Sequence, residues 1–168
     1  ALGAGEVWGI PIPIIVVFVV YAVAHYVLTQ TPYGRAIYAI GSNEEAARLS
    51  GVNVGWYKTA AFGVSGLLAG LAAIMFTGRI NSAHPLAGQG YELDAIAAVV
   101  IGGTSLSGGE GRILGTLIGA LIMGVIRNGL NLLMVDSYWQ QVIIGAVIVV
   151  AVLIDRRGRA AEGAAVVK

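Results

Sequence analysis

Four apolar stretches dominate this 168-residue sequence and limit what it can fold into. They cover residues 10–28, 57–76, 113–135 and 138–154. A helix of about 20 apolar residues is long enough to cross the hydrocarbon core of a bilayer. Only 11% of the residues are charged, which is too few to form the surface of a soluble domain. The sequence therefore predicts an all-α integral membrane protein and excludes a soluble globular domain and a disordered chain.

The basic residues predict one further crossing. They flank the loop 29–56 at Arg35, Arg48 and Lys58, and follow the last stretch at Arg156, Arg157 and Arg159. The positive-inside rule places both groups in the cytoplasm, together with the tail 155–168. After leaving the cytoplasm through residues 57–76, the chain must cross an odd number of times to return. We therefore predict about five crossings, one of them a short helix from Leu93 that breaks in the glycine-rich residues 102–109.

Small residues recur at four-residue spacing in two of the predicted spans. The pairs are Gly66 and Gly70, Ala69 and Ala73, Gly115 and Gly119, and Ala120 and Gly124. Such spacing allows the backbones of two membrane helices to approach closely. We therefore expect close helix contacts along both spans.

The loop 29–56 contains the pattern of a short capped helix. Ser42 and Glu45 have the spacing of a capping box, and Gly51 can end the helix that follows. The acidic pair Glu44 and Glu45 suits the positive end of this helix, and Arg48 suits the negative end. The pattern predicts a helix over residues 43–50 that must pack on something to be stable. Ala46, Leu49 and Asn53 fall on one face of it, with Ala47 and Ser50 beside them. It is either a connector on the bilayer surface or a docking element for a cytoplasmic partner.

Several polar residues fall in or beside the predicted membrane region. Glu92 and Asp94 precede the short helix, where they either stabilise its positive end or face an outer vestibule. Arg127 lies inside a span, and we expect it to reach back toward the outer interface. Candidate residues of a translocation path are Glu92, Asp94, Gly102, Gly103, Thr104, Ser105 and Asn128.

The sequence lacks the residues of common catalytic and metal sites. It has no cysteine and only two histidines, and its net charge of +1 argues against nucleic-acid binding. No phosphate-binding loop of the type Gly-x-x-x-x-Gly-Lys-Ser/Thr is present. We expect no catalytic residue, no metal site and no bound cofactor in this chain.

Residues 45–51 read Glu-Ala-Ala-Arg-Leu-Ser-Gly, which resembles the cytoplasmic-loop signature of permease subunits of ATP-binding-cassette importers. A wider resemblance to the ribose-type sugar permeases runs from about residue 9 to residue 155. Its most specific parts are residues 31–54, 90–106, 108–112, 115–120 and 128–133. The match covers only the C-terminal half of that family, so we expect residues 1–168 to be one transmembrane domain of a larger permease.

The resemblance implies a function and partners. The chain would belong to an ATP-driven importer of a ribose-like monosaccharide in the bacterial inner membrane, where it forms part of the path. Its partners would be a cytoplasmic ATPase that uses the ATP, a periplasmic or extracellular sugar-binding protein and a second permease copy. The coupling helix would then comprise Ser42, Asn43, Glu44, Glu45, Ala46, Ala47, Arg48, Leu49 and Gly51. The residues alone leave two alternatives open, an ATP-independent transporter or channel and a truncated membrane module that transports nothing.

Overall fold

The computed structural model describes residues 5–7, 9–82, 86 and 88–166. In that part of the chain two short strands precede seven helices. They are β1 (Glu6–Val7), β2 (Ile10–Pro11), α1 (Ile12–Gln30), α2 (Pro32–Ser42), α3 (Glu44–Leu49), α4 (Val54–Ile80), α5 (Tyr91–Ile101), α6 (Ile113–Leu132) and α7 (Ser137–Val166). The chain divides into two compact units, Ala1–Gln89 and Gly90–Lys168.

The long helices confirm the predicted fold class. Among the described residues, α1, α4 and α6 are long and apolar enough to cross a membrane, and Ser137–Leu153 of α7 forms a shorter apolar helix. The predicted short helix is α5, whose 11 residues end at Ile101. Residues 102–112 follow it without forming a helix or strand, as the glycine-rich sequence predicted. The chain is therefore an all-α, multi-pass membrane protein.

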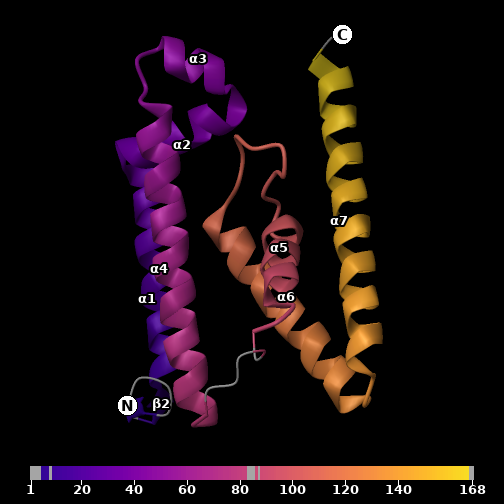
Figure 1. Ribbon diagram of the computed structural model, residues 1–168. Coiled ribbons are helices and arrows are strands. Elements are labelled where there is room, and N and C mark those ends of the chain that lie inside the picture. The colour runs from indigo at the N-terminus through magenta and orange to yellow at the C-terminus, as the bar shows by residue number, and fades with distance from the viewer. Residues whose placement is uncertain (1–4, 8, 83–85, 87, 167–168) are drawn as a thin grey trace. The chain divides into compact units, whose positions relative to one another are not determined.

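In the first unit, the axes of α1 and α4 run roughly parallel, and α2 and α3 lie at one end of the two helices (Figure 1). An apolar groove of about 360 Å³ separates the two long helices, with Val16 and Val20 on one side and Leu68 and Leu71 on the other. Their span-length windows contain no buried residue within the described chain. These two helices therefore present most of their apolar surface outward.

The sequence did not predict α2, which occupies residues read as loop. Pro32 is the first residue of this helix, a position where its fixed φ and missing N–H cost nothing. Gly34 lies against α1, where a Cβ would overlap the backbone of Leu28. The glycine therefore serves a close contact with α1. The sequence reading missed this helix because it lies within residues 29–56, which form one polar loop between the predicted spans.

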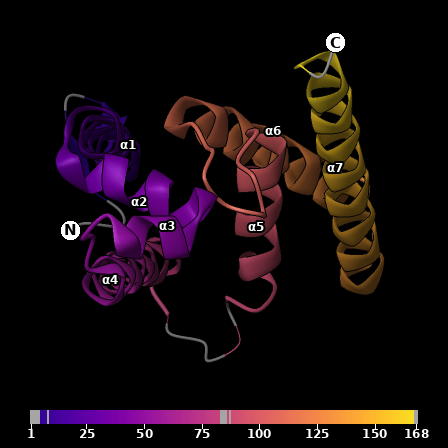
Figure 2. The same cartoon turned by 90° about the horizontal axis from the view of Figure 1, so that it is seen from above.

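In the second unit, α5 packs against both α6 and α7 (Figure 2). Its core consists of Ala97, Ala98, Met123 and Ile144, all buried. At one end of α5 the backbones of α5 and α6 meet without intervening side chains. A Cβ at Gly119 would overlap the carbonyl of Ala98. This contact confirms the close approach that the spacing of Gly115 and Gly119 predicted.

The other small-residue pairs lack such a contact. Nothing lies within 4 Å of a Cβ built at Gly66, Gly70 or Gly124 in the described part of the chain. Ala69 and Ala73 are likewise exposed. The prediction of close packing is therefore confirmed on α6 at Gly119. Along α4, no segment among the described residues packs closely against Gly66 or Gly70.

Candidate functional site

The helix predicted in the loop is α3, and its N-terminal cap is Asn43. The Asn43 side-chain oxygen accepts a hydrogen bond from the backbone N–H of Ala46 at 2.9 Å. The predicted cap, Ser42, was wrong because α2 continues through that residue. Asn43 has the extended backbone that separates the two helices, and asparagine caps a helix as well as serine does. The helix is consequently shorter than predicted, covering Glu44–Leu49.

Gly51 ends α3 in the way the sequence predicted. Its φ of +87° lies in the left-handed region that only glycine adopts without strain. The N–H of Gly51 donates to the carbonyl of Arg48 at 3.0 Å, and the N–H of Val52 donates to that of Ala47 at 3.1 Å. These paired bonds satisfy the last carbonyls of the helix. Both ends of α3 are therefore fixed by specific hydrogen bonds.

Ala47 provides the packing that so short a helix needs. It is buried in a small cluster with Ile40 of α2 and Val54 of α4. The face that carries Ala46 and Leu49 is not the packed one, because Ala46 is exposed and Leu49 is 82% exposed. The helix thus packs through the small side chain of Ala47 and exposes Leu49.

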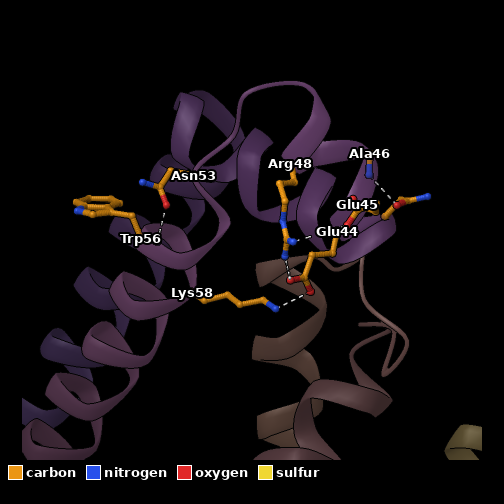
Figure 3. A network of polar contacts seen from close by, with 8 residues as sticks. Glu44, Glu45, Ala46, Arg48, Asn53, Trp56 and Lys58 are labelled. Carbon is orange, nitrogen blue, oxygen red and sulfur yellow. Dashed lines mark hydrogen bonds and ion pairs between the residues drawn. The ribbon is translucent and has the colours of Figure 1, made fainter.

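Glu44 links α3 to α4 through ion pairs (Figure 3). Its carboxylate lies 2.6 Å from the Lys58 ammonium and 3.4 Å from the Arg48 guanidinium. The hydrogen bond from Lys58, followed by its charge, lowers the pKa of Glu44 below the ordinary value. Glu45 has a weaker contact with Arg48, at 3.9 Å, and remains largely exposed. The two acidic residues therefore have different roles, since Glu44 joins α3 to α4 and Glu45 faces outward.

The two acidic residues of α5 also differ in role. The Glu92 carboxylate accepts a hydrogen bond from the backbone N–H of Gly90, the residue that precedes the helix, at 3.1 Å. Asp94 instead lies 2.7 Å from the guanidinium of Arg127 in α6. That guanidinium also lies over the ring of Tyr91, 5.0 Å from its centre. The sequence predicted that Arg127 reaches toward the outer interface, and the structure adds that α5 supplies a partner for its charge.

The break after α5 is an ordered turn. Gly103 has a φ of +80°, and the N–H groups of Gly103 and Thr104 donate to the carbonyls of Val100 and Val99. Ser105 is buried, and its N–H donates to the carbonyl of Glu110 at 3.0 Å. The glycine-rich residues therefore end α5 with the same motif that ends α3 and then form a closed loop.

The candidate path residues fall into separate places. Asp94 lies beside Arg127, whereas Gly102, Gly103, Thr104 and Ser105 lie at the other end of α5, about 12 Å away along the helix axis. Asn128 is exposed on α6. Sequence reasoning missed the pairing of Asp94 with Arg127 and the contact of Arg127 with Tyr91. The available signal was the antiparallel order of α5 and α6, which brings the start of one beside the end of the other.

No side-chain cluster suited to a metal ion occurs in the part of the chain that the structure describes. The groups in this part of the chain that could bind a partner or ligand act through hydrogen bonds and charge. They lie on the exposed face of α3 and in the ion pair between α5 and α6.

Comparison with known proteins identifies the family. Residues 2–152 match the family described as the branched-chain amino acid transport system / permease component. The ribose import permease protein RbsC of Haemophilus influenzae is 57% identical over 155 residues, which are 92% of this chain and 48% of that protein. RbsC of Bacillus subtilis is 54% identical with the same coverage. The D-allose transport system permease protein AlsC of Escherichia coli is 46% identical over 91% of this chain and 47% of that protein.

The chain thus spans about half the length of the curated relatives it matches. No solved structure matches it significantly. The family match covers most of the chain and includes α3, α5 and the loop between α5 and α6. The chain therefore belongs to the branched-chain amino acid transport system / permease component family.

Proposed function

We propose that this chain is part of the permease of an ATP-driven monosaccharide importer and that α3 is its docking helix for a cytoplasmic ATPase. The observation that carries the proposal is the construction of α3, a six-residue helix fixed at both ends and anchored to α4. A helix this short is not stable alone in water. Its hydrogen bonds, its packing through Ala47 and its ion pair with Lys58 hold it in one orientation.

The exposed side of α3 suits a protein partner. Leu49 is almost fully exposed, and the charged side chains of Glu45 and Arg48 flank it. An apolar side chain surrounded by charged groups can enter a pocket of a partner while its neighbours give specificity. A helix that merely connected two spans would have no need of an outward leucine on a fixed scaffold.

The ribose-type relatives support the substrate class and the partners. Under the proposal, ATP is hydrolysed by the partner, and a binding protein delivers the sugar from the opposite side of a bacterial inner membrane. A second permease copy completes the path. The positive-inside rule puts α3 and the tail 155–168 in the cytoplasm, so the break after α5 also lies toward that side. Movement of the ATPase would then reach the membrane helices through α3 and α4.

Transport by the reconstituted permease tests this proposal. The permease that contains this chain would be placed in liposomes with its ATPase and sugar-binding protein, and ribose uptake would be measured with and without ATP. We expect uptake only with ATP. Equal uptake without ATP would favour an ATP-independent transporter, and absence of uptake under both conditions would favour a membrane module that transports nothing.

A further inference from the structure

A partly buried ion pair joins α5 to α6. The Asp94 carboxylate and the Arg127 guanidinium are 2.7 Å apart, and their side chains are only 21% and 29% exposed. Arg127 belongs to a helix that is apolar and long enough to cross a membrane. Charged side chains in such helices are costly and commonly mark a functional site.

Packing of α5 on α6 does not require this pair. Away from it, the two helices are held together by backbone contact at Gly119 and by the buried side chains of Ala98 and Met123. Apolar side chains of similar size often replace a buried ion pair without loss of stability. A stabilising role alone therefore gives a weak reason for placing two charges here.

The pair leaves one acceptor and one donor without a partner. Asp94 Oδ1 and Arg127 Nε are both buried and make no hydrogen bond within the described part of the chain. Buried polar atoms in native proteins nearly always have a partner, which can be a water or a ligand. A hydroxyl group can supply both missing bonds, because it donates one hydrogen bond and accepts two.

A cavity of about 260 Å³ lies beside the pair. Asp94 and Arg127 form its polar wall, and Ala95, Ala98, Met123 and Gly124 contribute to the rest. A water occupies about 30 Å³, so the cavity has room for a larger molecule. The larger cavity of the same unit, about 660 Å³, has no charged residue in its lining and suits no polyol.

Space beside the pair also allows the side chains to adjust. A Cβ at Gly124 would meet nothing within 4 Å, so the side of α6 next to Arg127 is open. Contact of a ligand with Arg127 Nε and Asp94 Oδ1 requires such an adjustment, because both atoms are buried.

We propose that Asp94 and Arg127 form a hydroxyl-binding subsite for the transported sugar, an inference that rests on the proposed function. A sugar hydroxyl donates a hydrogen bond to Asp94 Oδ1 and accepts a hydrogen bond from Arg127 Nε. A water can make the same bonds when no sugar is present, and the experiment distinguishes these two hydroxyl sources.

The test compares uptake of ribose and of its monodeoxy analogues by the permease reconstituted with its ATPase and binding protein. The variant is the double substitution Asp94→Leu with Arg127→Met, which removes the charges together. The matched control is Asn131→Leu with Gln140→Met, which removes a polar pair 3.0 Å apart between α6 and α7. Because the binding protein is the same in every reaction, its own preference cancels when variants are compared.

For the control we expect wild-type uptake of every sugar. For the double variant we expect ribose uptake at limiting concentration to fall roughly 10-fold or more, as for loss of a hydrogen bond to a charged group. The wild-type preference for ribose over one deoxy analogue should also disappear in this variant. Arg127→Lys, which keeps the charge but loses Nε, should reduce the same preference and provides the test if the double variant does not fold.

Unchanged preference in both variants, with normal wild-type uptake, would overturn the subsite alone and assign the unpartnered atoms to water. Failure of the wild-type protein to take up any sugar would overturn the proposed function together with the subsite.

Discussion

The helices α4 and α6 carry the same small-residue spacing, yet among the described residues only α6 uses it for close packing. On α6, a Cβ at Gly119 would overlap the backbone of Ala98 in α5, and a Cβ at Gly115 would overlap that of Gly102, the residue after α5. On α4, the Cβ positions of Gly66 and Gly70 are open. The spacing of small residues therefore indicates where a helix can be approached closely, and the presence of a partner depends on the fold.

The largest effect should come from adding a methyl group to a glycine in the close α5–α6 contact. We expect Gly119→Ala to destabilise the protein by about 3 kcal/mol or more, because the added methyl group meets the rigid carbonyl of Ala98. Thermal unfolding in detergent measures the effect. Gly124→Ala, on the same helix but facing open space, is the matched control. Equal melting temperatures for the two variants would contradict the described helix contact.

A smaller effect is expected at the cap of α3. Asn43→Ala removes the acceptor for the Ala46 N–H and should cost about 1 kcal/mol of stability. Ser42→Ala, one residue earlier and inside α2, should cost less. Amide hydrogen exchange at residues 44–49 provides the measurement. Faster exchange in the serine variant than in the asparagine variant would show that Ser42 caps the helix, as the sequence predicted, and would contradict the assignment of Asn43.

A methyl group added to a glycine of α4 should be tolerated, in contrast to one added at Gly119 of α6. We expect Gly66→Ala to change stability by no more than about 1 kcal/mol, in the stabilising direction, because alanine favours the helix more than glycine does. The same thermal unfolding experiment applies. Strong destabilisation would reveal that another segment covers this face of α4, and the contrast between the two helices would then disappear.

The smallest effect concerns the ion pair between α3 and α4. Lys58 lowers the pKa of Glu44 below its ordinary value of 4.5. The stabilising contact is therefore fully present above about pH 4.5 and is lost as the pH falls through the lowered pKa. In Lys58→Met we expect the pKa of Glu44 to rise, by more than in Arg48→Met, since Lys58 is the larger cause. Carboxyl titration by NMR measures the pKa of Glu44 in both variants. An unchanged pKa in Lys58→Met would contradict the ion pair between α3 and α4.

Local signals in the sequence predicted most of the membrane fold. Apolar length located the long helices, and the parity of the crossings located the broken segment after α5. Gly51 was predictable because a left-handed C-cap follows from the residue type and its position. The choice of Asn43 over Ser42 was not, because adjacent residues can both cap a helix and the end of α2 decides between them.

Specific pairings between two helices escaped the sequence, although the spacing of Gly115 and Gly119 did predict a close approach. The helix α2 was read as part of a loop because residues 29–56 form the longest polar segment between the predicted spans, and no local pattern signals its contact with α1 at Gly34. The pairing of Asp94 with Arg127 depends on the register of α5 against α6, to which no local pattern refers. For the candidate site, the sequence therefore proposed Asp94 and the residues of α3 as candidates, but it did not predict their ion-pair partners Arg127 and Lys58.

Binding of the ATPase to α3 tests the central claim most directly. Leu49→Glu places a charge on the exposed face of α3 without touching Ala47 or the caps. Leu133→Glu, in the turn between α6 and α7 that the charge pattern puts on the opposite side of the membrane, is the control for an added charge. We predict that Leu49→Glu weakens ATPase binding at least about tenfold, as expected for loss of one apolar anchor, while the control binds like the wild type. Equal binding by all three proteins would contradict the assignment of α3 as the docking helix.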